Sequence, residues 1–148
     1  KKYDLIFHSR VLKDKGIYEL VEAIEILQKQ NIFFKTLILG SPDPLNRSSL
    51  KKKDLLFWME KKLIIWKPKV TNVLKFLHES KIAILPSYRE GLPKSLLEAA
   101  SCELPIITSD VAGCKDICIN NYNGFLVPRK NSELLAMAIK KLLCLPCI

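Results

Sequence analysis

The sequence lacks any apolar run long enough to cross a bilayer, because charged residues interrupt every candidate well short of about 18 residues. A secretory leader is not expected either, since the apolar stretch that follows Lys1 and Lys2 is too short. Glycine is scarce, with five residues against eight prolines, which excludes collagen-like and low-complexity sequence. A hydrophobic fraction of 49% excludes a disordered chain, and 148 residues suffice for one domain. We expect a cytoplasmic protein.

Histidines and cysteines are too few and too scattered for a metal site. His8 and His78 are far apart in sequence, and neither is near a cysteine. Cys144 and Cys147 have the C-x-x-C spacing, but no second Cys/His pair stands at the spacing of a zinc site. The five cysteines are an odd number, so we expect reduced, mostly buried thiols. No bound metal is expected.

Acidic residues are scarce relative to basic ones. The chain has 15 aspartates and glutamates against 24 lysines and arginines, which gives a formal net charge of +9. Such a surplus is typical of proteins that bind nucleic acid, anionic lipid or small phosphorylated ligands. The lysines are spread along the chain, so a solvated surface is the simpler explanation. No element concentrates arginine and aromatic residues as nucleic-acid readers do, and we expect no nucleic-acid partner.

Short apolar runs alternate with helical repeats along the chain. The runs expected to form buried strands are 5–7, 36–39, 63–66, 82–85, 105–108 and 125–127. Helices are expected over 17–30, over 48–62, after a cap at Thr71 or Asn72, over 93–102, and from a cap at Ser132 to 143. This alternation predicts an α/β fold, a Rossmann-like open parallel sheet with helices on both faces. Ligands of such sheets bind outside the carboxyl ends of the strands.

The loop after the first strand is a candidate phosphate site. The usual glycine motifs of dinucleotide and P-loop proteins are absent. This loop carries Arg10, whose guanidinium is a planar fork, and Lys15, whose ammonium is a mobile point charge. Gly16 allows a tight entry into the following helix. The alternative is an ordinary basic surface turn.

A second candidate site runs from a strand end into a helix over residues 90–98. Pro93 suits the first helical position, which predicts Leu92 as the cap. Gly91 lets the backbone come close to a ligand, and the helix N-terminus favours a diphosphate. The amides expected to point at that ligand are those of Leu92, Lys94 and Ser95.

Two carboxylates, Glu90 and Glu98, flank this helix start. They cannot attract a phosphate, but an ionised carboxylate accepts hydrogen bonds from vicinal hydroxyl groups. A ligand with phosphates between two sugars, a nucleotide sugar, would use both. The alternative is that Glu90 favours the helix dipole while Glu98 pairs with Lys94 one turn earlier.

Together these motifs resemble the C-terminal, donor-binding domain of retaining GT-B glycosyltransferases, specifically glycosyltransferase family 4. The resemblance covers nearly the whole chain. It is carried by residues 9–16, by 85–98 with its Glu-x7-Glu spacing, and by 97–102, 105–113 and 123–128. Within the family the chain most resembles the transferases that build bacterial lipopolysaccharide, capsule or lipid-linked glycans from UDP-N-acetylhexosamines or UDP-hexoses.

The resemblance implies a role for each site residue. Arg10 and Lys15 would bind the donor diphosphate and stabilise the leaving group, Glu90 would contact the donor sugar, and Glu98 would bind the ribose. Arg10, Lys15 and Glu90 are thus the expected catalytic residues, and the two cations would replace a divalent metal, so no cofactor is expected. The other residues expected at the donor site are Gly91, Leu92, Lys94, Ser95, Trp66 and Lys67, the last two beside the base.

Three departures from the family pattern stand out. Glu103 occupies a position where the family usually has glycine in a left-handed conformation, which costs glutamate on the order of 1 kcal/mol. Asp116 stands where glutamate is frequent. Residues 1–148 match only the nucleotide-sugar-binding domain of a GT-B enzyme, so the N-terminal acceptor domain is expected to be absent and the chain inactive, or nearly so, by itself.

A non-catalytic remnant or binding module of the same fold is the alternative function. Such a module would act through a partner domain or an anionic membrane at the inner, cytoplasmic face. Residues 49–63, which set lysines around Phe57 and Trp58, could lie on that membrane. The simpler alternative is a helix that packs its apolar face on the sheet.

Overall fold

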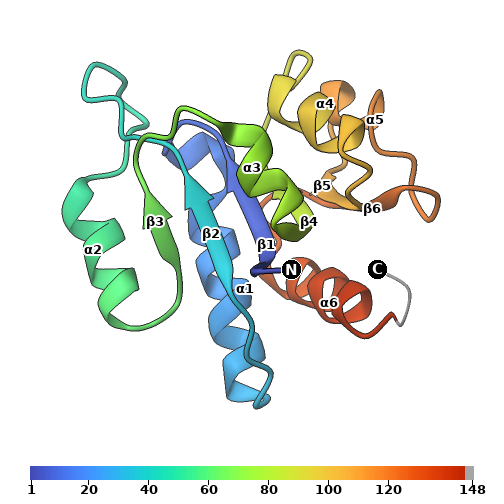
Figure 1. The fold of residues 1–148 in the computed structure, drawn as a ribbon, viewed down its shortest axis with the longest axis horizontal. Coiled ribbons are helices and arrows are strands. Elements are labelled where there is room, and N and C mark those ends of the chain that lie inside the picture. The colour runs from blue at the N-terminus through green and yellow to red at the C-terminus, as the bar shows by residue number, and fades with distance from the viewer. Residues whose placement is uncertain (146–148) are drawn as a thin grey trace.

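The computed structural model describes residues 1–145 and contains one six-stranded sheet in the order β3-β2-β1-β4-β5-β6 (Figure 1). The strands are β1 (Tyr3–His8), β2 (Thr36–Leu39), β3 (Ile65–Lys67), β4 (Ser80–Leu85), β5 (Ile106–Ser109) and β6 (Gly124–Val127). All neighbouring strands are parallel. The predicted open parallel sheet is therefore confirmed, and its strand order reverses between β1 and β4.

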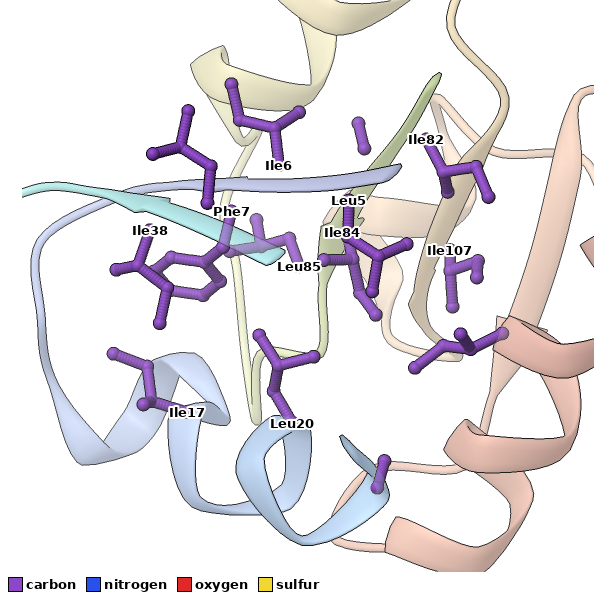
Figure 2. Packing of buried hydrophobic residues seen from close by; sticks show 14 of the residues in the cluster. Leu5, Ile6, Phe7, Ile17, Leu20, Ile38, Ile82, Ile84, Leu85 and Ile107 are labelled. Atoms are coloured by element: carbon purple, nitrogen blue, oxygen red, sulfur yellow. The ribbon is translucent and has the colours of Figure 1, made fainter. Parts of the chain in front are cut away.

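Helices cover both faces of this sheet. They are α1 (Ile17–Lys29), α2 (Lys52–Glu60), α3 (Val73–His78), α4 (Lys94–Ser101), α5 (Ala112–Lys115) and α6 (Ser132–Leu143), and a 3₁₀ turn, η1 (Lys13–Lys15), precedes α1. Helices α1 and α6 pack against each other. Neighbouring side chains of β1 point to opposite faces, with Phe7 toward Ile17 and Leu20 of α1 and Ile6 away from them (Figure 2). Because both faces of the central strands are buried, these strands read as unbroken apolar runs.

Helix α2 begins at Lys52, later than predicted, because residues 48–50 are bound elsewhere. The carbonyl oxygen of Ser48 accepts a hydrogen bond from the Lys13 amide at 2.6 Å, and the Leu50 amide donates to the Val11 carbonyl at 3.1 Å. This segment is therefore held on the turn after β1 and does not enter the helix. No helix within residues 1–145 is long and apolar enough to span a bilayer.

The predicted cap of α3 is confirmed and that of α6 is wrong by one residue. The side-chain oxygen of Asn72 accepts from the Lys75 amide at the start of α3. At α6 the cap is Asn131, whose side chain accepts from the Leu134 amide at 2.9 Å, and Ser132 is the first helical residue. Helix α5 is one the sequence does not predict.

The four described cysteines are free thiols, as expected, but only two of them are buried. Cys114 and Cys118 are buried, Cys102 is half-buried and Cys144 is exposed, and all four are free thiols. Burial raises the pKa of Cys118 to about 11, so its thiol stays protonated at neutral pH. Cys147 lies outside the described residues.

Glu103 follows the end of α4 and is left-handed, with a φ of 60°, so this turn has the conformation in which the resemblance places a glycine. Its amide donates to the Ala100 carbonyl at 2.9 Å, and the Leu104 amide donates to the Ala99 carbonyl at 3.1 Å. This pair of hydrogen bonds is the Schellman motif, whose left-handed residue is usually glycine.

Replacing this residue, Glu103→Gly, is expected to raise the free energy of unfolding by about 1 kcal/mol, because glycine adopts the left-handed conformation without strain. Urea unfolding followed by circular dichroism measures the change. Glu103→Ala is the matched control, since it removes the same carboxylate and keeps the strain. Equal stability of the two variants would show that the backbone conformation contributes nothing.

Candidate functional site

A cleft of about 920 Å³ opens at the carboxyl ends of the strands. Its walls come from the segments after β1, β2 and β4, so it lies where the strand order reverses, the usual ligand site of such sheets. The cleft brings together most of the residues singled out from the sequence. Those that line it are Arg10, Lys15, Glu90, Leu92, Lys94, Ser95 and Glu98.

An ion pair joins the two candidate loops at the cleft wall. Lys15 Nζ lies 2.5 Å from Glu90 Oε1, and the Ser87 hydroxyl donates to the same oxygen at 3.0 Å. The Lys15 side chain is 18% exposed and that of Glu90 is 9% exposed. An almost buried carboxylate needs such partners, because desolvation penalises an unpaired charge.

The backbone around Gly16 fixes Lys15 in this place. Gly16 has a φ of 79°, and a Cβ atom there would lie 1.9 Å from the Pro86 carbonyl oxygen. The Tyr88 amide donates to the Asp14 carbonyl at 2.8 Å. The turn before α1 and the loop after β4 therefore touch directly, which confirms that glycine is required for the tight helix entry.

Arg10 pairs with a residue that the sequence analysis did not single out. Its guanidinium lies 3.2 Å from the carboxylate of Asp43, in the loop after β2, and the Asp43 amide donates to the Ser49 hydroxyl at 2.8 Å. Strand polarity does point to this loop, since it follows a predicted strand, but no sequence feature marked Asp43 within it. An anionic ligand would have to compete with Asp43 for Arg10 and with Glu90 for Lys15. Within residues 1–145, no three His, Cys, Asp or Glu side chains gather as metal ligands would.

Helix α4 begins at Lys94, and its cap is Pro93 rather than the predicted Leu92. The Pro93 carbonyl accepts hydrogen bonds from the Leu96 amide at 3.1 Å and from the Leu97 amide at 3.3 Å. The amides of Lys94 and Ser95 lie in the first turn, where no intrahelical acceptor exists. Both residues line the cleft, so the helix N-terminus favours an anion there.

The loop that contains Glu90 and Gly91 packs closely against a glycine of α5, Gly113. A Cβ atom on Gly113 would lie 1.7 Å from the Gly91 carbonyl oxygen and 2.6 Å from that of Glu90. Gly91 itself is exposed, does not line the cleft, and has room for a Cβ atom, with nothing within 4 Å. Helix α5 therefore contacts the backbone of the Glu90 loop directly through Gly113.

Trp66 and Lys67 do not line the cleft. The buried indole of Trp66 donates from Nε1 to the Gly40 carbonyl at 2.8 Å, and the Lys67 carbonyl accepts from the Gly40 amide at 3.2 Å. Both residues hold the loop after β2, from which Gly40 and Asp43 reach the cleft wall. The contact of this segment with a base stays a prediction.

The family model for glycosyl transferases group 1 matches residues 1–146. The chain belongs to this family. It is 31% identical over 135 residues to the capsular polysaccharide biosynthesis glycosyltransferase CapM of Staphylococcus aureus. The matched segment covers 91% of this chain and 35% of CapM. It is 29% identical over 143 residues to the N,N'-diacetylbacillosaminyl-diphospho-undecaprenol alpha-1,3-N-acetylgalactosaminyltransferase of Campylobacter jejuni, with 97% of this chain and 36% of that enzyme covered. The chain spans about a third of the length of these relatives.

Solved glycosyltransferase structures share the fold of this group 1 domain. The pneumococcal O-GlcNAc transferase GtfA, in complex with UDP and GlcNAc, matches with a TM-score of 0.80 at 25% identity, over 97% of this chain and 29% of that one. A variant of S. aureus TarM in complex with fondaparinux, alpha-GlcNAc-glycerol and UDP matches with a TM-score of 0.81 at 26% identity, over 96% and 29%. The sheet and its helices are thus those of GT-B glycosyltransferases.

One further side chain of this glycosyltransferase domain lies in the cleft wall, His8 at the end of β1. Its Nδ1 atom is buried, has no hydrogen-bond partner within residues 1–145, and lies 4.0 Å from Glu98 Oε1. Among the ion pairs of these residues none joins Glu98 to Lys94, so the alternative pairing considered from the sequence is wrong. Burial lowers the pKa of His8, while the carboxylate of Glu98 acts in the opposite direction.

The lowered pKa of His8 predicts an acid-sensitive fold. Below the ordinary histidine pKa of 6.5 the unfolded chain binds a proton at this position more readily than the folded chain. The folded chain therefore has its full stability above that pH, and its free energy of unfolding decreases as the pH falls through the lowered pKa of His8. Urea unfolding at about pH 7.5 and about pH 5.5 measures the loss, which is expected to be smaller in His8→Gln. His78→Gln, which replaces the chain's other histidine at an exposed position, is the control variant. The same dependence in His8→Gln and in the unaltered chain would contradict this.

Proposed function

We propose that the cleft binds a nucleotide sugar, with UDP as the nucleotide, and that the chain is the donor-binding half of a retaining glycosyltransferase that builds bacterial lipopolysaccharide, capsule or other glycans. The observation that carries the proposal is the convergence, in one cleft, of two cations, a helix N-terminus and two carboxylates. These groups belong to Arg10, Lys15, the start of α4, Glu90 and Glu98.

Each group suits one part of such a donor. The guanidinium of Arg10, the ammonium of Lys15 and the free amides of α4 are hydrogen-bond donors that fit a diphosphate. The carboxylates of Glu90 and Glu98 accept hydrogen bonds only and fit hydroxyl groups, those of the transferred sugar and of the ribose respectively. No single one of these features would suffice, because each alone also occurs on ordinary protein surfaces.

The proposed chemistry is the transfer of a hexosyl or N-acetylhexosaminyl group. The bond between the anomeric carbon and the diphosphate oxygen breaks, the acceptor hydroxyl forms the new glycosidic bond and loses its proton, and the nucleoside diphosphate departs with added negative charge. Arg10 and Lys15 would stabilise that charge, which is electrostatic catalysis, and the proposal includes independence from metal ions. Retention of the anomeric configuration is likewise part of the proposal. A second domain would bind the acceptor, so residues 1–148 by themselves would be inactive or nearly so.

Similar glycosyltransferases that bind UDP or build glycans support this proposal. GtfA and the TarM variant are both complexes with UDP, and both match this chain over almost its whole length. CapM and the C. jejuni enzyme are named for capsule synthesis and for transfer to a lipid diphosphate. These names favour a UDP-sugar donor and a glycan product.

Isothermal titration of the chain with UDP in the presence of EDTA tests the proposal. Saturable binding is expected, and Arg10→Ala is expected to weaken it at least about tenfold, because a charge-assisted hydrogen bond contributes roughly 1.5–3 kcal/mol. Arg47→Ala is the matched control, since Arg47 is exposed in the loop after β2 and does not line the cleft. A folded chain that binds none of UDP, GDP and ADP would leave the non-catalytic binding module as its function.

A further inference from the structure

Helix α2 presents an apolar surface that the rest of the chain does not cover. It lies at the margin of the molecule beside the edge strand β3 (Figure 1). Leu55 is its one fully buried residue, whereas the side chains of Leu56 and Phe57 are 48% and 54% exposed. The helix does pack on the core through Leu55, with Trp58 and Met59 partly buried against it, but Leu56 and Phe57 lie outside that packed face.

A shallow groove between α1 and α2 extends this surface. It has a volume of about 660 Å³, and Phe33, Phe57 and Trp58 are among the residues that line it. Phe33 is 69% exposed, while Trp58 is fixed by an edge-on contact with Tyr18 of α1, with ring centres 5.7 Å apart. Phe33 and Phe57 thus line the groove with their rings largely exposed, and Leu56 is exposed next to Phe57 on α2.

Exposed lysines accompany these apolar side chains, two of them in the groove lining and the others in α2 or directly beside its ends. We call the whole surface the α2 face, and it consists of Phe33, Leu56 and Phe57 with Lys29, Lys51, Lys52, Lys53, Lys61 and Lys62. None of these six lysines belongs to an ion pair of residues 1–145. The Lys61 ammonium lies 5.4 Å from the centre of the Phe57 ring. The nearby acidic residues, Glu25, Asp54 and Glu60, are fewer than the lysines.

We propose that the α2 face binds an anionic membrane surface. Lysines that lack protein partners can reach lipid phosphates and carboxylates, while their long stems lie along apolar surface. Exposed phenylalanine and leucine side chains insert at the boundary between headgroups and acyl chains. The combination favours lipid over nucleic acid, since the face contains no arginine, the side chain that nucleic-acid sites use most for phosphate and base contacts.

The α2 face is separate from the donor cleft, and this inference does not rest on the proposed function. No residue of the face lines the cleft. The two are nevertheless close along the chain, because the loop that carries Asp43 into the cleft wall continues through Ser49 to Lys51 at the start of α2. A chain bound to a membrane through this face would keep its cleft unobstructed by its own docking residues.

Co-sedimentation of the 148-residue chain with lipid vesicles tests the proposal. Binding is expected to vesicles that contain roughly one-third phosphatidylserine and not to vesicles of phosphatidylcholine alone. Raising the sodium chloride concentration from about 50 mM to about 500 mM is expected to release most of the chain, since salt screens surface charges. Equal binding to both kinds of vesicle, or no binding to the anionic ones, would overturn the proposal.

Paired variants separate this face from the net charge of the chain. Lys53→Glu with Lys61→Glu is expected to weaken binding at least about tenfold, whereas Lys140→Glu with Lys141→Glu on α6, an equal change in net charge, is expected to have little effect. Phe57→Ser is expected to weaken binding, and Met137→Ser, on an exposed site of α6, is the apolar control. Circular dichroism shows whether each variant is folded. Equal losses in the α2 and α6 variants would overturn the proposal, as would self-association of the chain that depends on Phe57 in place of vesicle binding.

Discussion

Lys15→Met is expected to lower the affinity of the chain for UDP by roughly 10- to 100-fold, because it removes one charge-assisted donor from the diphosphate. The same change is expected to lower the free energy of unfolding by about 2 kcal/mol, since Glu90 would lose the partner that compensates its burial. Lys13→Met is the matched control. It alters an exposed lysine of the same turn that does not line the cleft, and it is expected to change neither quantity much.

A second variant separates the two effects of Lys15. Replacing both partners, Lys15→Met with Glu90→Gln, leaves no buried charge and is expected to recover most of the lost stability. It is not expected to recover UDP affinity, because the cation is still absent. Isothermal titration and urea unfolding of the three variants provide the comparison. Recovery of both quantities in the double variant would mean that Lys15 only maintains the fold.

Gly113→Ala is expected to cost about 3 kcal/mol or more of stability, because its Cβ atom would lie 1.7 Å from the carbonyl oxygen of Gly91. A backbone atom cannot rotate away as a side chain can, so helix α5 and the Glu90 loop must move apart. Such a shift would displace Glu90 from Lys15 and weaken UDP binding as well. Thermal and urea unfolding measure the first effect, and titration of the variant that remains folded measures the second.

Gly91→Ala is the control for this prediction. It adds the same methyl group on the other side of the same contact, where nothing lies within 4 Å, and its effect on stability is expected to stay within about 0.5 kcal/mol. Similar losses in the two variants would contradict the packing described for Gly113. A loss of UDP affinity without a loss of stability in Gly91→Ala would support the predicted approach of this backbone to the ligand.

The grouping of the charged site residues could be predicted from the sequence, because strand polarity dictates it. Once the runs around Phe7 and Leu85 are assigned to parallel strands, the residues that follow them must meet at one edge of the sheet. Arg10, Lys15 and Glu90 accordingly line one cleft. The resemblance marked position 103 as one where glycine is usually left-handed, but it did not determine whether glutamate adopts the same turn, and the structure shows that it does.

Contacts between segments far apart in the chain could not be predicted in this way. Asp43 reaches Arg10, and Gly113 touches the backbone of Gly91, only because the fold brings their loops together. His8 was treated from the sequence as one of two scattered histidines, although its place directly after a buried run put it at the ligand edge. Helix α5 is short, and so small a helix leaves no periodic pattern to recognise.

Helix starts were the other weak point, because neighbouring residues can compete for the same capping position. Asn131 and Ser132 are both good caps, and the side chain of Asn131 takes the role. At α4 the residue next to the predicted cap, Pro93, lies outside the helix. Neither shift moves the amides of Lys94 and Ser95 away from the cleft.

A crystal structure of the chain with UDP tests the central claim most directly. The diphosphate is expected within hydrogen-bond distance of Arg10, Lys15 and the amides of Lys94 and Ser95, with the ribose hydroxyls on Glu98. Lys15 is expected to have turned from Glu90 toward the phosphate. UDP bound at another surface, or bound in the cleft with its phosphates away from both cations, would contradict the account.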